Sequence, residues 1–528
     1  MNNKKIQVWL PLLFSITMIA GMFIGYKMRD NMPGKSFFYT EKRRPVQEII
    51  DLIQHKYVDE VNVRDLTDTA IQAMLSKLDP HSVFIPAEEL QQVNDDLAGK
   101  FSGIGIEFNI FDDTLNVIYV FKDGPGFKAG LVPGDKIIRA NDSLIAGKKL
   151  GTDSFRKIFR GERGSEISID VLRNGSLKKI TITRDNIPVP SLDAAYMLTK
   201  TTGYIRLNKF SSHTYHEFME ALLSLKKQGL QQLVLDLRDN GGGLLEEATD
   251  IADELLDGDK LITYTEGKHT EKREYRCHRP GQFETGALVV LANEGTASAS
   301  EILIGALQDW DRATVIGRRS FGKGLVQEQF DLSDHSALRL TIARYYTPVG
   351  RSIQRPYTNG GKAYYDEIIN RYHDGETSSA DSVKLDKSKV FKTHAGKLVY
   401  GSGGINPDFF IPLDTTRYSG NMLKLYNGNT ISNFAYHYFL EQPAIKEFKT
   451  AADFAARFSL SEDDWKRFAA AAETDSVSLQ NISPAQKADL QRDIKSTIAR
   501  QRWRSEGYFE VQNSNDEAIK KALSVLGQ

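Results

Sequence analysis

Cysteine is almost absent from this 528-residue chain, in which Cys277 is the only one. A single cysteine excludes an intrachain disulfide and a cysteine-based zinc site. Because a reactive thiol needs an activating neighbourhood, we interpret Cys277 as a passive thiol. The shortage of cysteine does not indicate a reducing compartment, since large hydrophobic cores need no covalent cross-links.

An excess of charge of one sign is also missing. The chain has 68 Lys and Arg against 69 Asp and Glu, which gives a net charge of -1. It has no long basic run and no RNA-binding signature, so we expect no nucleic-acid partner. The apolar fraction of 41% is that of an ordinary globular protein, and the length predicts several domains rather than one core.

Two common hydrolase motifs are absent. There is no G-x-S-x-G turn for a Ser-His-Asp triad and no H-E-x-x-H motif for a zinc peptidase, although the chain has 10 histidines. His213 and His216 begin a helical run and are interpreted as surface residues, and His81, in a turn after Asp-Pro, as structural. We expect neither a metal nor an organic cofactor.

A long hydrophobic run occurs at the N-terminus. Val8–Tyr26 carries no charge and follows Lys4 and Lys5. It nearly reaches the ~20 residues needed to span a bilayer, and Ile19–Gly25 is a poor match to a signal-peptidase site. The pattern favours an uncleaved signal anchor over a cleaved signal peptide, while basic residues on both sides leave its orientation open.

The rest of the chain changes pattern several times. Helical spacing of apolar residues gives way to short strands bounded by turn residues, then to alternating strands and helices, and finally to helices again. The predicted regions are 1–30 (membrane anchor), 31–96 (helical), 97–185 (β-rich), 186–420 (α/β) and 421–528 (helical).

The central region predicts an α/β fold. Strands are expected at Gln232–Leu237, Ala287–Ala292 and Ala313–Gly317, with helices at Leu244–Leu256 and about Ser298–Gln308. Strands separated by helices imply a mainly parallel sheet with crossover connections.

A cluster of hydroxyl residues follows the second of these strands. Ser298 is expected to open a helix, where unpaired backbone N–H groups and the helix dipole favour a developing oxyanion. Ala297 and Ala299 leave room beside it for a substrate chain. The alternative is that Thr296, Ser298 and Ser300 are only helix-capping residues.

A lysine between two glycines follows the third strand. Lys323 would serve as a base only if burial lowered its pKa from about 10, and Gln327, four residues on, is placed to orient the amine. Gly317–Lys323 also fits the phosphate-binding pattern G-x-x-x-x-G-K. That pattern needs Ser or Thr where this chain has Gly324, and a helix where Leu325–Phe330 reads as a strand, which argues against nucleotide binding.

Three glycines follow the first strand, in the segment Asp236–Gly243. Consecutive glycines between a strand and a helix form a nest of N–H donors, which suits an oxyanion hole or a phosphate.

Together these segments resemble the carboxy-terminal processing peptidases, or tail-specific proteases, over residues from about 45 to about 415. The resemblance implies a ClpP/crotonase-like α/β protease core with Ser298 as nucleophile, Lys323 as general base and Gln327 as its orienting residue. It also implies an oxyanion hole of backbone N–H groups from Ala299 and from Gly241, Gly242 or Gly243. The matching segments are Leu78–Ser82, Phe101–Ile106, Leu235–Gly243, Gly295–Ile302, Phe321–Gly324 and Tyr346–Gln354.

The β-rich insert resembles a PDZ domain. The segment Gly103, Ile104, Gly105 and Ile106 matches the loop whose N–H groups capture a peptide C-terminus. Arg160 or Arg163 would couple this domain to the protease, the alternative being solvated turn arginines.

The resemblance thus implies a serine endopeptidase anchored in the cell (inner) membrane by one span, with its catalytic part in the periplasm or outside the cell. Its expected substrates are proteins with free, flexible, apolar C-termini. A catalytically inactive PDZ adaptor is the competing interpretation. The helical region 421–528 lies outside the resemblance, and homo-oligomer assembly, covering of the site and adaptor binding are its candidate roles.

Overall fold

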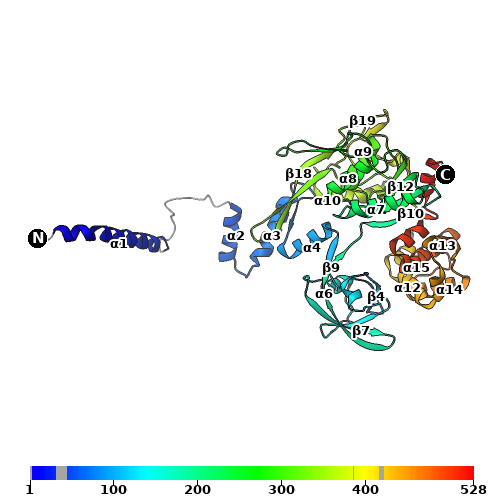
Figure 1. The fold of residues 1–528 in the computed structure, drawn as a ribbon, viewed down its shortest axis with the longest axis horizontal. Helices are drawn as coiled ribbons and strands as arrows, with labels where there is room; N and C mark the ends of the chain where they lie inside the picture. The colour runs from blue at the N-terminus through cyan, green and yellow to red at the C-terminus, as the bar shows by residue number, and fades with distance from the viewer. Residues whose placement is uncertain (1–2, 31–44, 385, 416–420, 528) are drawn as a thin grey trace. The chain divides into compact units, whose positions relative to one another are not determined.

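The computed structural model describes residues 3–30, 45–384, 386–415 and 421–527. Its contacts divide the chain into two compact units, Met1–Met74 and Leu75–Gln528 (Figure 1). The first unit carries α1 (Asn3–Asp30), α2 (Pro45–Lys56) and nearly all of α3 (Val63–Leu75).

The N-terminal elements largely follow the predicted pattern. Within α1, residues Trp9–Lys27 are apolar and long enough to cross a membrane. The predicted helical region 31–96 contains α2, α3 and α4 (Ala87–Leu97), but β1 (Val83–Ile85) interrupts it. Its first residues, 31–44, lie outside the described residues.

The β-rich insert folds around an antiparallel sheet with the order β3-β4-β5-β7-β8. Strand β3 lies at the edge of this sheet, and Phe155 and Phe159 of α6 pack into its core. The elements are β2 (Lys100–Gly103), β3 (Ile106–Phe111), β4 (Thr114–Val120), α5 (Pro125–Lys128), β5 (Lys136–Ala140), β6 (Ser143–Leu144), α6 (Thr152–Phe159), β7 (Glu166–Arg173), β8 (Ser176–Thr183) and β9 (Asp185–Pro188).

The central region contains the predicted sheet, in the order β10-β11-β12-β15-β16-β21. Its strands are parallel from β11 to β21, and only β10 is antiparallel to its neighbour. The elements are β10 (Leu192–Met197), β11 (Thr202–Leu207), α7 (Thr214–Lys227), β12 (Gln232–Asp236), α8 (Leu245–Leu255), β15 (Ala287–Ala292), α9 (Ala299–Asp309), β16 (Thr314–Gly317) and β21 (Phe409–Phe410).

Both faces of this sheet are buried, which explains the nearly continuous apolar runs of its central strands. One face carries Leu235 and Val290 in a core shared with α7, α8 and α9. The other face carries Val234 and Val289, which share a core with Ile519 of the C-terminal helix α16 (Glu517–Val525). The C-terminal region therefore contributes side chains to the hydrophobic core of the protease domain.

The sheet topology brings three loops to one edge. Strands β12, β15 and β16 are parallel neighbours, so their carboxyl ends point the same way. The glycine turn Gly241–Gly243 follows β12, Ser298 follows β15, and the loop with Lys323 follows β16.

A second sheet, with the order β1-β18-β13-β14 and β17 paired to β18, carries the chain onward from Lys323. Strand β17 begins two residues after this lysine, so the predicted strand is confirmed and the helix of a phosphate loop is absent there. The elements are β13 (Leu261–Glu266), β14 (Arg273–Arg276), β17 (Leu325–Asp331), β18 (Ala337–Tyr346), α10 (Gly360–His373), the 3-10 turn Ala380–Ser382, β19 (Val390–Lys392) and β20 (Leu398–Tyr400).

The C-terminal region is helical, as predicted, and the side chains of Ser461 and Ser483 cap the first turns of two of its helices. Helix α15 is kinked at Arg504, whose backbone (φ 60°, ψ -149°) is not helical. The elements are α11 (Asn421–Asn427), α12 (Thr430–Glu441), the 3-10 turn Pro443–Glu447, α13 (Ala451–Arg457), α14 (Glu462–Thr474), α15 (Pro484–Asn513) and α16 (Glu517–Val525).

Candidate active site

Ser298 sits on a strained turn between β15 and α9. Its backbone has φ 56° and ψ -118°, a conformation that residues other than glycine rarely adopt. Such strain persists only where the surroundings enforce it, and it is typical of functional sites. The turn thus presents the Ser298 side chain at the N-terminal end of a buried helix.

The three hydroxyl residues of this turn differ in what their side chains do. The hydroxyl of Thr296 donates to Leu237 O at 2.8 Å, and that of Ser300 donates to Asn240 O at 2.9 Å. Both residues are fully buried, whereas Ser298 is partly exposed. Thr296 and Ser300 therefore stabilise the turn, and Ser298 is the one open to a substrate.

One buried carboxylate joins the serine turn to the lysine loop. Glu301 accepts hydrogen bonds from the N–H groups of Ser298 (2.9 Å), Gly322 (2.7 Å) and Lys323 (2.8 Å), and from the Ser320 hydroxyl. Its burial raises its pKa, and these hydrogen bonds oppose the rise. Glu301 thus fixes the backbone of both candidate catalytic residues at once.

A tyrosine from β18 bridges the same two loops. The Tyr345 hydroxyl lies 3.2 Å from Ser298 O and within hydrogen-bond distance of Lys323 O. Its burial raises its pKa well above the usual value, so it stays protonated. A further backbone hydrogen bond, from Phe321 N to Thr296 O at 2.9 Å, closes the contact between the loops.

Lys323 is held where its positive charge is disfavoured. Burial lowers the pKa of its amine, and the Arg339 guanidinium lowers it further. Glu301 and Asp79 act in the opposite direction, and the net pKa is below the usual value. A lysine in this setting can be neutral and accept a proton.

His81, interpreted from sequence as structural, lies close enough to Lys323 to sense its charge. Burial lowers the pKa of His81 to about 4, with Lys323 the next contribution. Its ring Nε2 is 3.0 Å from the Tyr364 hydroxyl, and Asp79 accepts its backbone N–H at 2.8 Å. The turn between α3 and β1 is therefore part of the wall around the lysine.

Gln327 forms a hydrogen bond with Thr341 rather than with the amine of Lys323, which was the expected partner. Its side-chain amide donates to the Thr341 hydroxyl at 3.3 Å, and Thr341 donates to Asp79 at 3.1 Å. Within the described residues no hydrogen bond joins Gln327 to the amine of Lys323. The network connects Gln327 to the turn that borders the lysine.

The glycine turn approaches Ser298 through Gly242. A side chain there would lie 2.7 Å from Ser298 Cβ and 2.8 Å from Ala299 N. The Gly242 N–H donates to Asn240 Oδ1 at 2.9 Å, so it is already used. Gly241 is exposed and has open space around its Cα, while Gly243 packs against the backbone of Phe210.

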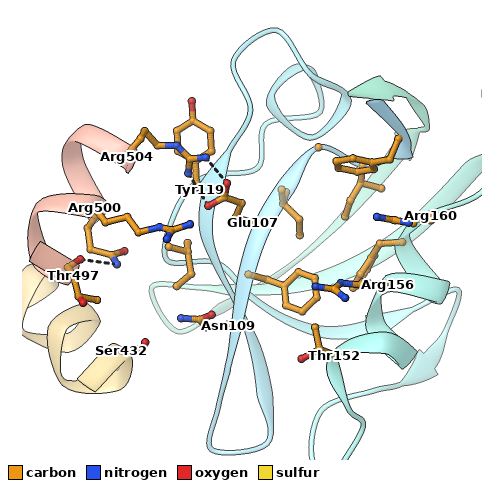
Figure 2. Close-up of a pocket in the computed structure, with 18 of the residues that line it drawn as sticks. Glu107, Asn109, Tyr119, Thr152, Arg156, Arg160, Ser432, Thr497, Arg500 and Arg504 are labelled. Carbon is orange, nitrogen blue, oxygen red and sulfur yellow. Dashed lines mark hydrogen bonds and ion pairs between the residues drawn. The ribbon is translucent and has the colours of Figure 1, made fainter. Parts of the chain in front are cut away.

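The predicted carboxylate loop borders a cavity of about 620 Å³ between the β-rich insert and the C-terminal region (Figure 2). Ile104, Gly105 and Ile106 line this cavity, as does Arg160. Arg163 does not line it, and its guanidinium pairs with Asp185 of β9 at 2.7 Å.

Neither Cys277 nor a metal cluster adds to the site. Cys277 is buried, and burial raises the pKa of its thiol to about 12. In the part of the chain that the structure describes, no group of three or more His, Cys, Asp or Glu side chains is arranged to hold a metal ion.

Profiles of four protein families match the chain. Residues 201–360 match peptidase family S41, and residues 102–183 match the PDZ domain. Residues 26–89 match the activating protease CtpB N-terminal domain, and residues 422–504 match a family of unknown function, DUF8443.

Several proteins are similar over most of their length. A probable CtpA-like serine protease of Staphylococcus epidermidis is 32% identical over 400 residues, which cover 71% of this chain and 79% of the relative. A carboxy-terminal-processing protease of Bartonella bacilliformis is 36% identical over 313 residues, covering 58% and 71%. The solved structure of a photosystem II D1 C-terminal processing protease is 30% identical and covers 60% of this chain and 84% of its own, with a TM-score of 0.36.

Proposed function

The chain belongs to the carboxy-terminal processing peptidases of family S41 and is a serine peptidase, and from this premise we propose that Ser298 is its nucleophile and Lys323 its general base. The observation that carries this proposal is the contact between the two loops. A strained, partly exposed serine and a partly buried lysine of lowered pKa are fixed through one carboxylate, Glu301.

The proposed reaction is acyl transfer. The neutral amine of Lys323 takes the proton of the Ser298 hydroxyl as its oxygen attacks the scissile carbonyl carbon. The resulting ammonium then gives its proton to the leaving amine, and water attacks the acyl-enzyme with Lys323 again acting as base. Burial of the lysine supports this assignment, because an exposed amine would be protonated at neutral pH.

Two backbone N–H groups are proposed to bind the oxyanion. The N–H of Ala299 begins α9, where the helix dipole favours negative charge. Gly241 is the better donor in the glycine turn, because the Gly242 N–H already donates to Asn240. Gln327 is proposed to turn from Thr341 towards the lysine amine when substrate enters, since catalytic hydrogen bonds often tighten only in the complex.

The PDZ domain is proposed to select substrates by their free C-termini. Among the strands that the structure describes, β3 pairs with β4 alone, which leaves its other edge open to an extended peptide. Apolar side chains of Ile104, Ile106 and Phe108 line the cavity beside it, which supports a preference for apolar terminal residues. The helix at Trp9–Lys27 supports anchoring in a membrane. The catalytic part is proposed to lie outside the cytoplasm, as the resemblance to the family implies.

Cleavage of a disordered polypeptide with an apolar C-terminus tests this function. The full-length chain in detergent should cleave it, and Ser298→Ala should abolish cleavage while leaving peptide binding intact. The matched control is Ser224→Ala, which removes an exposed hydroxyl of α7 and should retain activity. Cleavage by pure Ser298→Ala protein would contradict the assignment, and binding without cleavage by the unsubstituted chain would favour the adaptor.

A further inference from the structure

The cavity beside the PDZ strand β3 is formed by two regions that lie far apart in the sequence. Strand β3 and helix α6 form one side, and helix α15 of the C-terminal region forms the other (Figure 2). Thr497, Arg500 and Arg504 of α15 line it directly. A peptide added to β3 would therefore contact the C-terminal region as well as the PDZ domain.

The helical wall is attached to the PDZ domain by specific contacts. The Arg504 guanidinium forms a two-pronged ion pair with Glu107 of β3 and stacks over the Tyr119 ring at 3.7 Å. Phe111 stacks on Tyr436 of α12 with ring centroids 4.8 Å apart. Arg504 is also the strained residue at the kink of α15. Because such strain persists only where the surrounding structure enforces it, we infer that these contacts fix the position of α15 beside β3.

The charge around the cavity is mostly positive. Its lining has four arginines and one carboxylate, Glu107, and that carboxylate is already paired with Arg504. Among the described residues, Arg500 has neither an ion pair nor a hydrogen bond from its side chain, and it is exposed. Figure 2 shows Arg500 extending from α15 on one side and Arg156 from α6 on the other, with the strands of the β3–β4 hairpin between them. The Arg156 guanidinium is already paired with Asp153 at 3.2 Å. An unpaired guanidinium that borders an open cavity favours an anionic ligand.

We propose that the guanidinium of Arg500 binds an acidic side chain of the substrate, close to the substrate's apolar C-terminus. This inference rests on the proposed function and names the substrate class more narrowly. The terminal carboxylate would bind the N–H groups of Gly103–Ile106, and the chain would pair with β3. An extended chain rises about 3.3 Å per residue, so an acidic residue among the last few lies within about 10 Å of the terminus, inside this cavity.

The proposal also assigns a role to the C-terminal region. Residues 422–504 match a family of unknown function, and they include both Arg500 and Arg504. In this chain the region forms a second wall of the peptide groove, so it selects substrates in addition to covering the core sheet with α16.

Equilibrium binding tests the role of Arg500 separately from catalysis. The full-length Ser298→Ala chain is titrated with two fluorescein-labelled peptides that end in the same apolar residues and differ by Glu or Gln two positions upstream. The Glu peptide should bind about 5-fold more tightly at low salt. Adding Arg500→Gln should bring this ratio to about 1, with little change for the Gln peptide.

Two further variants make the outcome decisive. Lys157→Gln removes an exposed positive charge of α6 that does not line the cavity, and it should keep the 5-fold ratio. Arg500→Glu should reverse the preference in favour of a Lys peptide. A ratio unaffected by Arg500→Gln, or no binding of either peptide, would overturn the proposal. Cleavage by the unsubstituted chain, and its loss in Ser298→Ala, are measured separately. The binding proposal can therefore fail while the proposed peptidase function is retained.

Discussion

The catalytic loops and the peptide groove are built from different kinds of contact. In the loops, main-chain N–H groups of Ser298, Gly322 and Lys323 converge on one fully buried carboxylate. In the groove, long arginine side chains face open space, and the pair that joins its two sides, Arg504–Glu107, is about one-third exposed. The first arrangement fixes atoms, and the second leaves room for different side chains.

This difference matches what each region has to do. Acyl transfer needs reacting atoms held within a narrow geometry, and a displacement of about 1 Å costs about 10²-fold in rate. Recognition of a flexible C-terminus tolerates more variation, because charge and apolar contact act over a broader range. Residues that tune substrate choice can therefore change in α15 without disturbing the chemistry.

The largest effect is expected at the lysine. Lys323→Arg should lower kcat by about 10³-fold, because a guanidinium stays protonated and cannot act as base. Peptide binding to the groove should be unchanged, which separates the two regions. Single-turnover cleavage and binding of a labelled peptide measure the two properties, and full activity in Lys323→Arg would require another base.

The same lysine predicts the pH dependence of the reaction. Burial lowers the pKa of Lys323, so the neutral amine is present at lower pH than for an exposed lysine. As the pH falls through this lowered pKa, the amine is protonated and kcat should fall with it. Glu107 and Arg500 should not affect this profile.

A pair of neighbouring glycines gives the next largest effect. Gly242→Ala would place a methyl group 2.7 Å from Ser298 Cβ at φ 93°, so the serine turn must shift and kcat should fall by about 10²-fold. Gly241→Ala meets open space and should keep activity within about 3-fold, because its backbone N–H is retained. Equal effects of the two changes would contradict the tight contact seen at Gly242.

Much of the catalytic region follows from local sequence. Strand β15 begins and ends at the predicted residues, and the helix after Ser298 begins one residue later than expected. Parallel strands with their loops at one edge then bring the serine and lysine segments together. Glu301 was missed, although its position three residues after Ser298 is the spacing of a capping box.

The remaining features depend on contacts between distant residues. Tyr345 reaches the site because β18 pairs with β17 in a second sheet, and His81 because β1 pairs with β18. Arg504 and Glu107 are 397 positions apart. No periodicity or motif encodes such contacts, so the two-sided groove could not be predicted from the sequence.

A smaller effect is expected at the ion pair that joins the groove. Glu107→Gln should raise KM for a peptide with a free C-terminus by about 2–5-fold and leave kcat unchanged, since a partly exposed pair contributes about 1 kcal/mol or less. The effect should shrink as salt is added. Glu166→Gln, an exposed change at the start of β7, is the control. A fall in kcat instead of a rise in KM would mean that this contact acts on the catalytic loops.

The smallest effect concerns the stability of helix α15, which forms one wall of the groove. Glu510 follows the kink of α15, and burial together with Glu506 raises its pKa from 4.5 to about 7. Between pH 4.5 and 7 the folded chain keeps a proton that the unfolded chain has lost, so the free energy of unfolding decreases as the pH rises. Glu510→Gln removes this penalty and should raise Tm by about 1–2 °C at pH 8 and leave it unchanged at pH 4. Thermal unfolding of both chains at the two pH values measures the difference, and an equal shift at both would show that the carboxyl is not responsible.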